Sequence, residues 1–219
     1  MSVRRIPVVE RIMGANDEVA LRNRRTLDAH GVHAINIMAS PGAGKTSLIL
    51  GTLRALQGRR SVGVIEGDLA SNVDTEKVRA AGVPAVQINT GGNCHLDAIQ
   101  IEQALKELPL NEIDILFIEN VGNMICPVGF ALGEHTRLAI SSIPEGDDKP
   151  HKYPSIFAGV DALVLNKMDL LPLVEFNVDE FRRLVRSLNP DINIFEVSCS
   201  NDEGLDRWAE WLIELTPDK

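Results

Sequence analysis

The fold of this chain is decided by the stretch Ala39-Ser40-Pro41-Gly42-Ala43-Gly44-Lys45-Thr46. It follows a short apolar run, 33–38, that is typical of a strand, and it leads into a segment, 45–56, with the pattern of a helix. A glycine-rich turn that ends in Lys-Thr between a strand and a helix is a P-loop, which cradles the phosphates of a nucleotide. One position departs from the usual pattern, because alanine stands first where glycine is common.

The chemistry of this loop assigns its residues. Gly42 and Gly44 let the backbone curl so that successive N–H groups point at phosphate oxygens, and the start of the following helix adds its dipole. Lys45 is expected to reach the terminal phosphates as a catalytic residue, and the Thr46 hydroxyl is expected to ligate Mg²⁺. The residues of this stretch predicted to bind nucleotide are Gly42, Ala43, Gly44, Lys45, Thr46 and Ser47.

Outside the loop, short apolar segments alternate with segments of helical pattern. We expect strands at 33–38, 61–65, 84–88, 113–118, 162–165 and 192–197. We expect helices at 15–30, 45–56, 74–81, 96–108, 178–188 and 205–215. This alternation predicts an α/β fold with a mostly parallel central sheet flanked by helices and preceded by an N-terminal helix.

One stretch, 122–160, breaks the alternation. It contains a possible short strand at 137–143 and then a polar segment with three prolines, which we expect to form a loop. Loops of that length in a compact domain are usually functional.

Acidic residues follow two of the expected strands. Glu66 and Asp68 come just past the second strand, and Glu119 ends the strand at 113–118. Ligands collect at the carboxyl edge of a parallel sheet, so we expect Thr46, Asp68 and Glu119 to hold Mg²⁺. Glu119-Asn120-Val121-Gly122 is similar to the Asp-x-x-Gly of GTPases, and the Gly122 N–H is expected to bond the γ-phosphate.

The residue that positions the attacking water is not fixed by these motifs. Asp68 and Asp74 are both candidates for this catalytic role, and the sequence does not choose between them. It also offers no glutamine or arginine that is an obvious choice. We therefore expect hydrolysis to be slow without a partner, because the positioned charge that stabilises the transition state is incomplete.

The base of the nucleotide is predicted from Asn166-Lys167-Met168-Asp169, which follows the strand at 162–165. This is the Asn-Lys-x-Asp pattern, in which the aspartate accepts hydrogen bonds from guanine N1–H and its exocyclic amine. Asn166 is expected to tie this loop to the P-loop, and the Lys167 stem to lie along the base. Ser198 and Cys199 stand where GTPases contact the guanine oxygen. The ligand is thus expected to be GTP or GDP, bound by a P-loop GTPase domain at 31–219 behind an N-terminal helical extension at 1–30.

The chain has three cysteines, Cys94, Cys126 and Cys199, a count that argues against a disulfide framework. Cys94 is adjacent to His95, and Cys126 lies four residues past Gly122. Two thiolates and an imidazole are suitable ligands for Ni²⁺ or Zn²⁺. From the spacing alone, buried structural cysteines are the favoured alternative. Three ligands also leave a four-coordinate site incomplete, so water or a second chain would have to complete it.

Composition limits the partners. The chain has 219 residues, a net charge of −9 and 44% hydrophobic residues, which suits one acidic domain with a full core. We expect no nucleic-acid partner and no membrane partner, because both require a basic surface. No secretory signal and no apolar run long enough to cross a bilayer is recognisable, so the expected location is cytoplasmic.

The joint set of motifs resembles the HypB family, the hydrogenase nickel-incorporation GTPases, from about Asn16 to the C-terminus. Besides the P-loop and the Asn-Lys-Met-Asp motif, it is carried by Asn23-Arg24, Glu66-Gly67-Asp68, Cys94-His95-Leu96-Asp97-Ala98, Glu119-Asn120-Val121-Gly122-Asn123, Cys126-Pro127, Glu145-Gly146-Asp147-Asp148-Lys149-Pro150 and Lys152-Tyr153-Pro154. The resemblance implies a P-loop NTPase fold of the SIMIBI class of GTPases, the broad class that also holds the urease nickel-insertion GTPases.

The resemblance further implies a homodimer promoted by GTP, with Ni²⁺ or Zn²⁺ bound through Cys94, His95 and Cys126. It implies work with a companion nickel chaperone to load the large subunit of a [NiFe]-hydrogenase. A cysteine-rich N-terminal motif and a histidine-rich tract, which some members carry, are absent from this sequence.

Three alternatives stay open. The first is a GTPase chaperone for another metal- or cofactor-dependent enzyme, such as a urease or a mutase. The second is a metal-binding dimer switch in which GTP serves only as a ligand. The third is a small-molecule kinase on a P-loop scaffold, which the Asn-Lys-Met-Asp motif disfavours.

Overall fold

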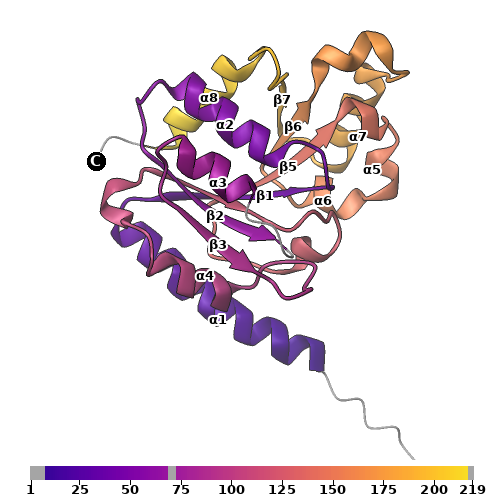
Figure 1. Cartoon of the computed structure of the whole chain (residues 1–219). Coiled ribbons are helices and arrows are strands. Elements are labelled where there is room, and N and C mark those ends of the chain that lie inside the picture. The colour runs from indigo at the N-terminus through magenta and orange to yellow at the C-terminus, as the bar shows by residue number, and fades with distance from the viewer. Residues whose placement is uncertain (1–7, 69–72, 217–219) are drawn as a thin grey trace, which may run out of the picture.

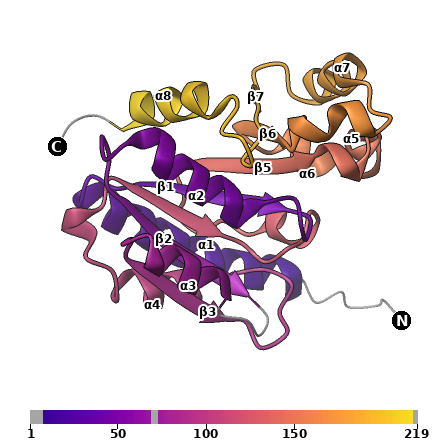
Figure 2. The ribbon, with the colours of Figure 1, turned by 45° about the horizontal axis from the view of Figure 1, so that its top comes forward.

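The computed structural model describes the backbone of residues 8–68 and 73–216 and the side chains of residues 14–68 and 76–216. Seven strands form one parallel sheet in the order β3-β2-β4-β1-β5-β6-β7, with helices on both faces (Figures 1 and 2). The strands are β1 (His33–Ala39), β2 (Val62–Asp68), β3 (Ala85–Asn89), β4 (Ile115–Glu119), β5 (Thr136–Ser142), β6 (Ala162–Asn166) and β7 (Asn193–Glu196). The parallel α/β sheet predicted from the alternation is confirmed.

The helices form two layers over this sheet. They are α1 (Val8–Ala29), α2 (Lys45–Leu56), α3 (Val73–Ala80), α4 (Ala98–Leu105), α5 (Lys149–Lys152), α6 (Pro154–Ala158), α7 (Val178–Leu188) and α8 (Leu205–Leu215). Helices α2, α3 and α8 cover one face, while α1 and α4 cover the other face over β1, β2 and β4. Helices α6 and α7 cover that second face over β5 and β6. In the part of the chain that the structure describes, no helix combines the length and apolarity that crossing a bilayer requires.

The core is divided by the sheet, because successive side chains of a strand point to opposite faces. In β4, Ile115 and Phe117 pack under α2 and α8, whereas Leu116 and Ile118 pack under α1 and α4. Each such side chain contributes about 1.5–3 kcal/mol when fully buried. Trp208 of α8 is fully buried as well, and its indole N–H donates to Thr52 Oγ1 of α2 at 2.8 Å, so its one polar group is satisfied.

The stretch 122–160 is only partly the loop that we expected. The possible short strand at 137–143 is confirmed as β5, which pairs with β1 on one side and β6 on the other, in the middle of the sheet. The segment that follows it is not a loop, because it supplies α5 and α6. The prolines that suggested a loop occupy the first turns of short helices, where a missing N–H is tolerated.

Two boundaries near the predicted site also differ. β2 runs on to Asp68, so Glu66 and Asp68 belong to the strand instead of following it. α4 begins at Ala98, because Asp97 and Gln100 form a capping box in which each side chain bonds the backbone of the other. We expected this helix to start at Leu96, directly after His95. Because it starts two residues later, Cys94 and His95 lie in the loop before α4.

Two histidines are packed together where the end of α1 meets β1. The rings of His33 and His135 stack with 4.8 Å between centroids. The Ala34 N–H donates to His135 Nδ1, and His135 Nε2 lies 2.8 Å from Asp28 Oδ1, which places the single ring proton on Nε2. Burial, followed by the charges of His135 and Arg24, lowers the pKa of His33 to about 4. Burial also lowers the pKa of His135.

The protein is expected to lose stability as the pH falls from about 6.5, the ordinary pKa of an exposed histidine, through the folded pKa of His33 at about 4. A histidine with a lowered pKa in the fold binds its proton more readily in the unfolded chain, so acid favours unfolding. Arg24, Asp28 and Glu134 are the charged groups around the pair. His33→Phe keeps the stacked ring but cannot titrate, and it should flatten this part of the pH dependence. Urea unfolding at about pH 7 and about pH 5 measures the effect. Equal losses of unfolding free energy in both proteins would contradict it.

Candidate functional site

The P-loop lies at the carboxyl edge of the sheet, between the end of β1 and the start of α2. Gly42 has a φ of 77° and Gly44 a φ of 104°, a region that glycine adopts without strain. The loop borders a cavity of about 310 Å³. The described residues that line this cavity are Gly42, Gly44, Lys45, Thr46, Ser47, Leu50, Lys77, Glu119 and Lys167. The sequence therefore predicted six of these nine residues from its phosphate and carboxylate motifs and a seventh, Lys167, from its base motif.

Asn166 and Lys167 hold the P-loop in shape from the neighbouring side of the sheet. Asn166 Nδ2 donates to Ala43 O at 3.0 Å, and Lys167 Nζ donates to Gly42 O at 2.6 Å. A Cβ atom on Gly44 would collide with the Asn166 amide, so packing as well as φ requires glycine there. The predicted tie between the base loop and the phosphate loop is confirmed in its geometry.

The expected guanine contacts come together at the ends of β6 and β7. The Ser198 hydroxyl donates to Asp169 Oδ1 at 2.5 Å, and this bond holds the pKa of Asp169 below its ordinary value. Asp169 is thus ionised and oriented, as a carboxylate that accepts two guanine donors must be. The Cys199 N–H faces Asn166 Oδ1 at 3.4 Å.

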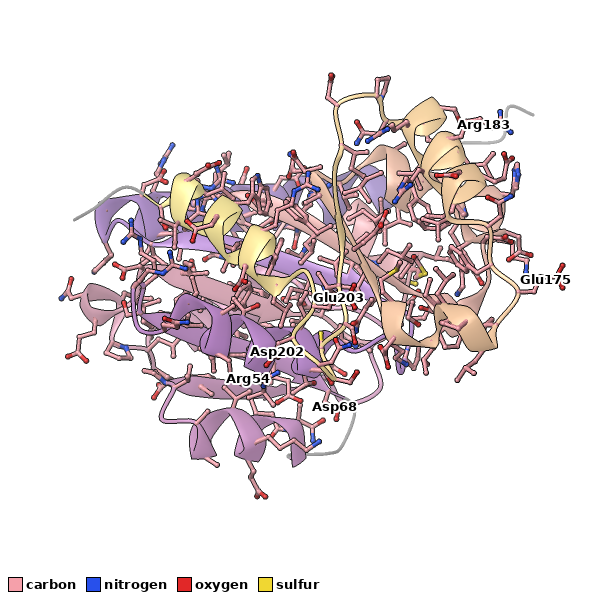
Figure 3. All side chains as sticks on the ribbon, turned by 90° about the horizontal axis from the view of Figure 1, so that it is seen from above. Arg54, Asp68, Glu175, Arg183, Asp202 and Glu203 are labelled. Carbon is pink, nitrogen blue, oxygen red and sulfur yellow. The ribbon has the colours of Figure 1, made fainter. Side chains whose placement is uncertain are left out.

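Burial raises the pKa of Cys199 to about 11, so its thiol is neutral and structural. The loop that carries it is fastened to α2, where Arg54 forms an ion pair with Asp202 and also donates to Cys199 O (Figure 3). Of the three cysteines, Cys199 is therefore part of the base loop and lies apart from the other two.

Thr46 and Glu119 face each other across the phosphate cavity. Thr46 Oγ1 lies 3.1 and 3.2 Å from the two carboxylate oxygens of Glu119, and Lys45 Nζ lies 3.8 Å from Glu119 Oε1. β4 is paired in register with β1, which places Glu119 beside Ile37 and close to the loop. A hydroxyl and a carboxylate are the hard oxygen ligands that Mg²⁺ prefers, so this pair fits the ion.

The other two carboxylates are placed less directly. Asp68 is the half-buried last residue of β2, which is separated from β1 by β4 (Figure 3). It is not among the described residues that line the phosphate cavity. Asp74 belongs to the backbone of α3, and its side chain lies outside the described residues. Neither the third magnesium ligand nor the water-positioning residue is therefore fixed by these contacts.

The backbone that follows Glu119 presses against the P-loop. A Cβ atom on Gly122 would lie 3.0–3.2 Å from atoms of Pro41, so the chain passes there with no room for a side chain. The next residue, Asn123, bonds toward both cysteines. Its Nδ2 donates to Cys94 O at 3.3 Å, and its Oδ1 accepts from the Cys126 N–H at 3.4 Å. Gly122, which touches the P-loop, is thus directly followed by Asn123, which bonds the backbone of both cysteines.

Cys94, His95 and Cys126 form a cluster in which the three ligand atoms all lie within 4.8 Å of one another. Cys94 Sγ is 3.5 Å from His95 Nδ1. A hydrogen bond with Cys126 is the main cause that raises the pKa of the Cys94 thiol. Cys94 is exposed and the other two are half-buried, so an ion can enter from solvent. This donor set of two sulfurs and one imidazole fits Ni²⁺ or Zn²⁺.

Two lysines near the phosphate site were not predicted from the sequence. Lys77 lines the cavity from α3. Lys149 Nζ lies 3.0 Å from both Ser40 Oγ and Glu145 Oε1, and so ties α5 to the start of the P-loop. Neither stands in a nucleotide motif, although Lys149 belongs to the stretch 145–150 that contributed to the family resemblance.

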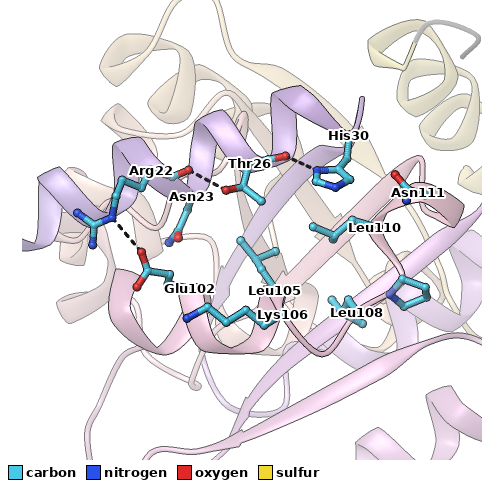
Figure 4. A pocket seen from close by; sticks show the side chains of 11 residues that line it. Arg22, Asn23, Thr26, His30, Glu102, Leu105, Lys106, Leu108, Leu110 and Asn111 are labelled. Atoms are coloured by element: carbon cyan, nitrogen blue, oxygen red, sulfur yellow. Dashed lines mark hydrogen bonds and ion pairs between the residues drawn. The ribbon is translucent and has the colours of Figure 1, made fainter.

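A larger cavity of about 580 Å³ lies elsewhere, between α1 and α4 (Figure 4). Its rim carries an ion pair between Arg22 and Glu102 and a hydrogen bond between His30 and Thr26. It has no glycine and no start of an α-helix among its lining residues, so we assign the nucleotide to the smaller cavity at the P-loop.

Comparisons with known proteins agree with this geometry. The profile of the "CobW/HypB/UreG, nucleotide-binding domain" matches residues 33–196. The hydrogenase maturation factor HypB of Azotobacter vinelandii is 46% identical over 209 residues, which cover 95% of this chain and 69% of that protein. A hydrogenase/urease maturation factor HypB of Helicobacter pylori is 37% identical and covers 98% of this chain and 89% of that protein.

Among solved structures, HypB from Helicobacter pylori in complex with nickel matches with a TM-score of 0.88 at 36% identity. The match covers 92% of this chain and 95% of that one. The matched range, 33–196, spans the P-loop, the cysteine–histidine cluster and the Asn-Lys-Met-Asp motif of this chain. With relatives this similar over nearly its whole length, the chain belongs to the HypB family of hydrogenase maturation factors, within the wider CobW/HypB/UreG family.

Proposed function

We propose that this chain is a GTPase that couples its nucleotide state to the binding and delivery of nickel during [NiFe]-hydrogenase maturation. The observation that carries the proposal is the position of Asn123. It follows Gly122, which touches the P-loop, and its side chain bonds the backbone of both Cys94 and Cys126. A movement of Gly122 at the P-loop is therefore passed by Asn123 to the backbone of Cys94 and Cys126.

The nucleotide chemistry is that of phosphoryl transfer, in which the protein contributes positioning and electrostatic stabilisation. Lys45 neutralises charge on the terminal phosphates, and the P-loop N–H groups hold them in place. Thr46 and Glu119 would hold Mg²⁺, which would neutralise charge that develops on the phosphates. Either Asp68 or Asp74 orients the attacking water. With no arginine finger in the described site, turnover of the isolated protein is slow.

The metal chemistry follows from the donor set. Nickel is the cargo, and Zn²⁺ competes for the same ligands because thiolates and imidazole accept both. Cys94, His95 and Cys126 provide three donors, which leaves a fourth position for water or for a second copy of the chain. The proposal therefore includes a GTP-promoted homodimer, a companion nickel chaperone and the large subunit of the hydrogenase as partners.

Coupling has to be reciprocal: if GTP changes nickel affinity by some factor, nickel changes GTP affinity by the same factor. Gly122 approaches the γ-phosphate in the GTP state and is released in the GDP state. Asn123 moves with it, and the distance between the Cys94 loop and Cys126 changes. Delivery then follows from a lower metal affinity in one of the two nucleotide states.

Cys94→Ser is expected to weaken nickel binding by about 100-fold and to remove its dependence on nucleotide, because a thiolate ligand is lost from a three-donor site. The measurement is a nickel titration of the wild-type chain and the variant, each with GDP and with a non-hydrolysable GTP analogue. Molecular mass is recorded in each state.

Cys199→Ser is the matched control, since that cysteine lies in the base loop and should leave nickel affinity unchanged. If nickel affinity is the same with GDP and with the GTP analogue, the coupling model is wrong. If binding also ignores Cys94→Ser, the cysteines are structural and the cargo has to be sought elsewhere.

A different client is the one alternative that a specific observation favours. A relative that covers nearly all of this chain is named for both hydrogenase and urease maturation. Transfer of nickel from the loaded chain to purified apo-urease, compared with an apo-hydrogenase large subunit, distinguishes the two clients.

A further inference from the structure

We infer that α1 is a clamp on the nickel site: Asn16 and Asn23 are positioning residues that fix the distance between the segment carrying Cys94 and His95 and the segment carrying Cys126. The inference rests on the proposed function, because it concerns the same cluster. It assigns to the N-terminal helix a role in metal affinity that its packing alone does not require.

Asn16 bridges the two segments directly. Its Oδ1 accepts from the Ala98 N–H at 2.9 Å, and its Nδ2 donates to Ala131 O at 2.8 Å. Ala98 is the third residue after His95, and Ala131 is the fifth after Cys126. One side chain, buried on α1, therefore ties the start of α4 to the segment after Cys126, although the two are more than 30 residues apart in the sequence.

Asn23 repeats the bridge two turns further along the helix. Residues seven apart lie on the same face of a helix, so both asparagines point toward α4. Asn23 Nδ2 donates to Ala98 O at 2.8 Å and to Leu132 O at 2.9 Å. Its Oδ1 has no hydrogen-bond partner in the described part of the chain, so the two donated bonds are what this buried amide contributes.

The backbone at Gly133 packs directly against α1. Gly133 has a φ of 100°, and a Cβ atom there would lie 2.7 Å from Ala20 O and from Asn23 Cβ. Arg24 Nε donates to Gly133 O at 2.9 Å. The segment after Cys126 is thus packed against the helix backbone itself, and α1 cannot shift without moving it.

The clamp reaches the metal ligands through short connections. Phe130, the residue before Ala131, places its ring 4.0 Å from the His95 ring, measured between centroids. On the other side, the Leu96 N–H donates to the buried Asn120 Oδ1 at 3.0 Å, which fixes the residue next to His95 against the end of β4. His95 is therefore held between a ring that α1 positions and a backbone bond that β4 positions.

Asn16→Ala is expected to weaken nickel binding by about 10-fold or more, in the range that loss of an outer-shell contact costs a metal site. Affinity for GDP should stay unchanged, because Asn16 touches no residue of the nucleotide cavity. The thiolate-to-nickel charge-transfer absorption should broaden or shift, since the ligand geometry is no longer fixed. A loss of general packing would lower thermal stability without altering this absorption.

Arg22→Ala is the matched control. It removes the ion pair with Glu102 on the exposed side of the same two helices (Figure 4) and should leave nickel affinity and absorption as in the wild-type chain. If Asn16→Ala does not fold, Asn16→Asp serves in its place. It keeps an acceptor for the Ala98 N–H but loses the donor to Ala131 O.

The two failures are distinguishable. If the wild-type chain binds no nickel, the proposed function is wrong. If the wild-type chain binds nickel and Asn16→Ala binds it equally well with an unchanged spectrum, the clamp is wrong and the proposed function stands. An effect of the same size in Arg22→Ala would also overturn the clamp, because it would show that any loosening of α1 is sufficient.

Discussion

Asp169→Asn is expected to lower affinity for GTP by about 100-fold or more and to create affinity for xanthosine triphosphate. The Asp169 carboxylate is oriented by the Ser198 hydroxyl and can accept from both guanine donors. An asparagine amide places an N–H donor opposite one of the two guanine donors, which disfavours guanine. The same N–H can donate to the carbonyl that xanthine carries in place of the exocyclic amine. Equilibrium binding of the two nucleotides to both proteins measures the switch.

Asp202→Asn is the control for this substitution. Asp202 is a nearby exposed carboxylate that pairs with Arg54, and its φ of 63° is one that asparagine tolerates. It should leave the preference for GTP intact. If Asp169→Asn binds GTP as well as the wild-type chain, the base is recognised elsewhere and the assignment of the guanine site is wrong.

Lys45→Ala is expected to reduce GTP hydrolysis by about 1,000-fold, the effect of removing one well-placed charge-stabilising donor. Lys45 borders the phosphate cavity and lies 3.8 Å from Glu119, so its loss leaves the phosphate charge facing a carboxylate. Nickel binding by the nucleotide-free protein should remain nearly intact, because Lys45 is not part of the cysteine–histidine cluster. Single-turnover hydrolysis and a nickel titration measure the two properties.

Lys77→Ala is the control for Lys45→Ala. It tests whether hydrolysis needs a positive charge at the position of Lys45 or only a positive charge somewhere in the cavity. Lys77 lines the same cavity from α3, outside the P-loop, and its removal should cost less than about 10-fold in turnover. A well-folded Lys45→Ala protein that loses both hydrolysis and nickel binding would argue against two separate sites.

The sequence predicts most strongly what depends on local chemistry. The P-loop, the Glu119 segment and the base motif each need particular residues at fixed spacing. In the structure Thr46 lies beside Glu119, and Asn166 makes the expected bond to the P-loop. The limits of α2, α7 and α8 also agree with the prediction. Each of these helices begins directly after a glycine or an asparagine, namely Gly44, Asn177 and Gly204.

What depends on tertiary context was missed. The strand at 136–142 was predicted to within one residue at each end, but the segment after it, with its prolines and charged residues, was expected to be a loop and forms α5 and α6. The start of α4 was placed early because apolar Leu96 resembles a first helical residue, whereas the Asp97 cap sets the true start. Cys94, His95 and Cys126 were grouped as suitable metal ligands by residue type, but their spacing alone favoured structural cysteines, and only the resemblance favoured a metal site.

The positioning residues are harder still to recognise from sequence. Asn16 and Asn23 are polar members of an otherwise apolar helix stripe with Val19 and Leu27. Such a pattern indicates a buried polar contact, but it does not say with which segment. Their partners are backbone groups, which carry no sequence signature at all.

The support that Asn166 and Lys167 give to the P-loop has a consequence for how the protein is made. A growing chain that has just completed β4 already contains the whole phosphate loop, yet β5, which flanks β1, and the two side chains that brace Gly42 and Ala43 have not been synthesised. Chains are made from the N-terminus, and this sheet closes only with its later strands. GTP therefore has no finished pocket to bind during most of synthesis, and it can stabilise only a nearly complete chain.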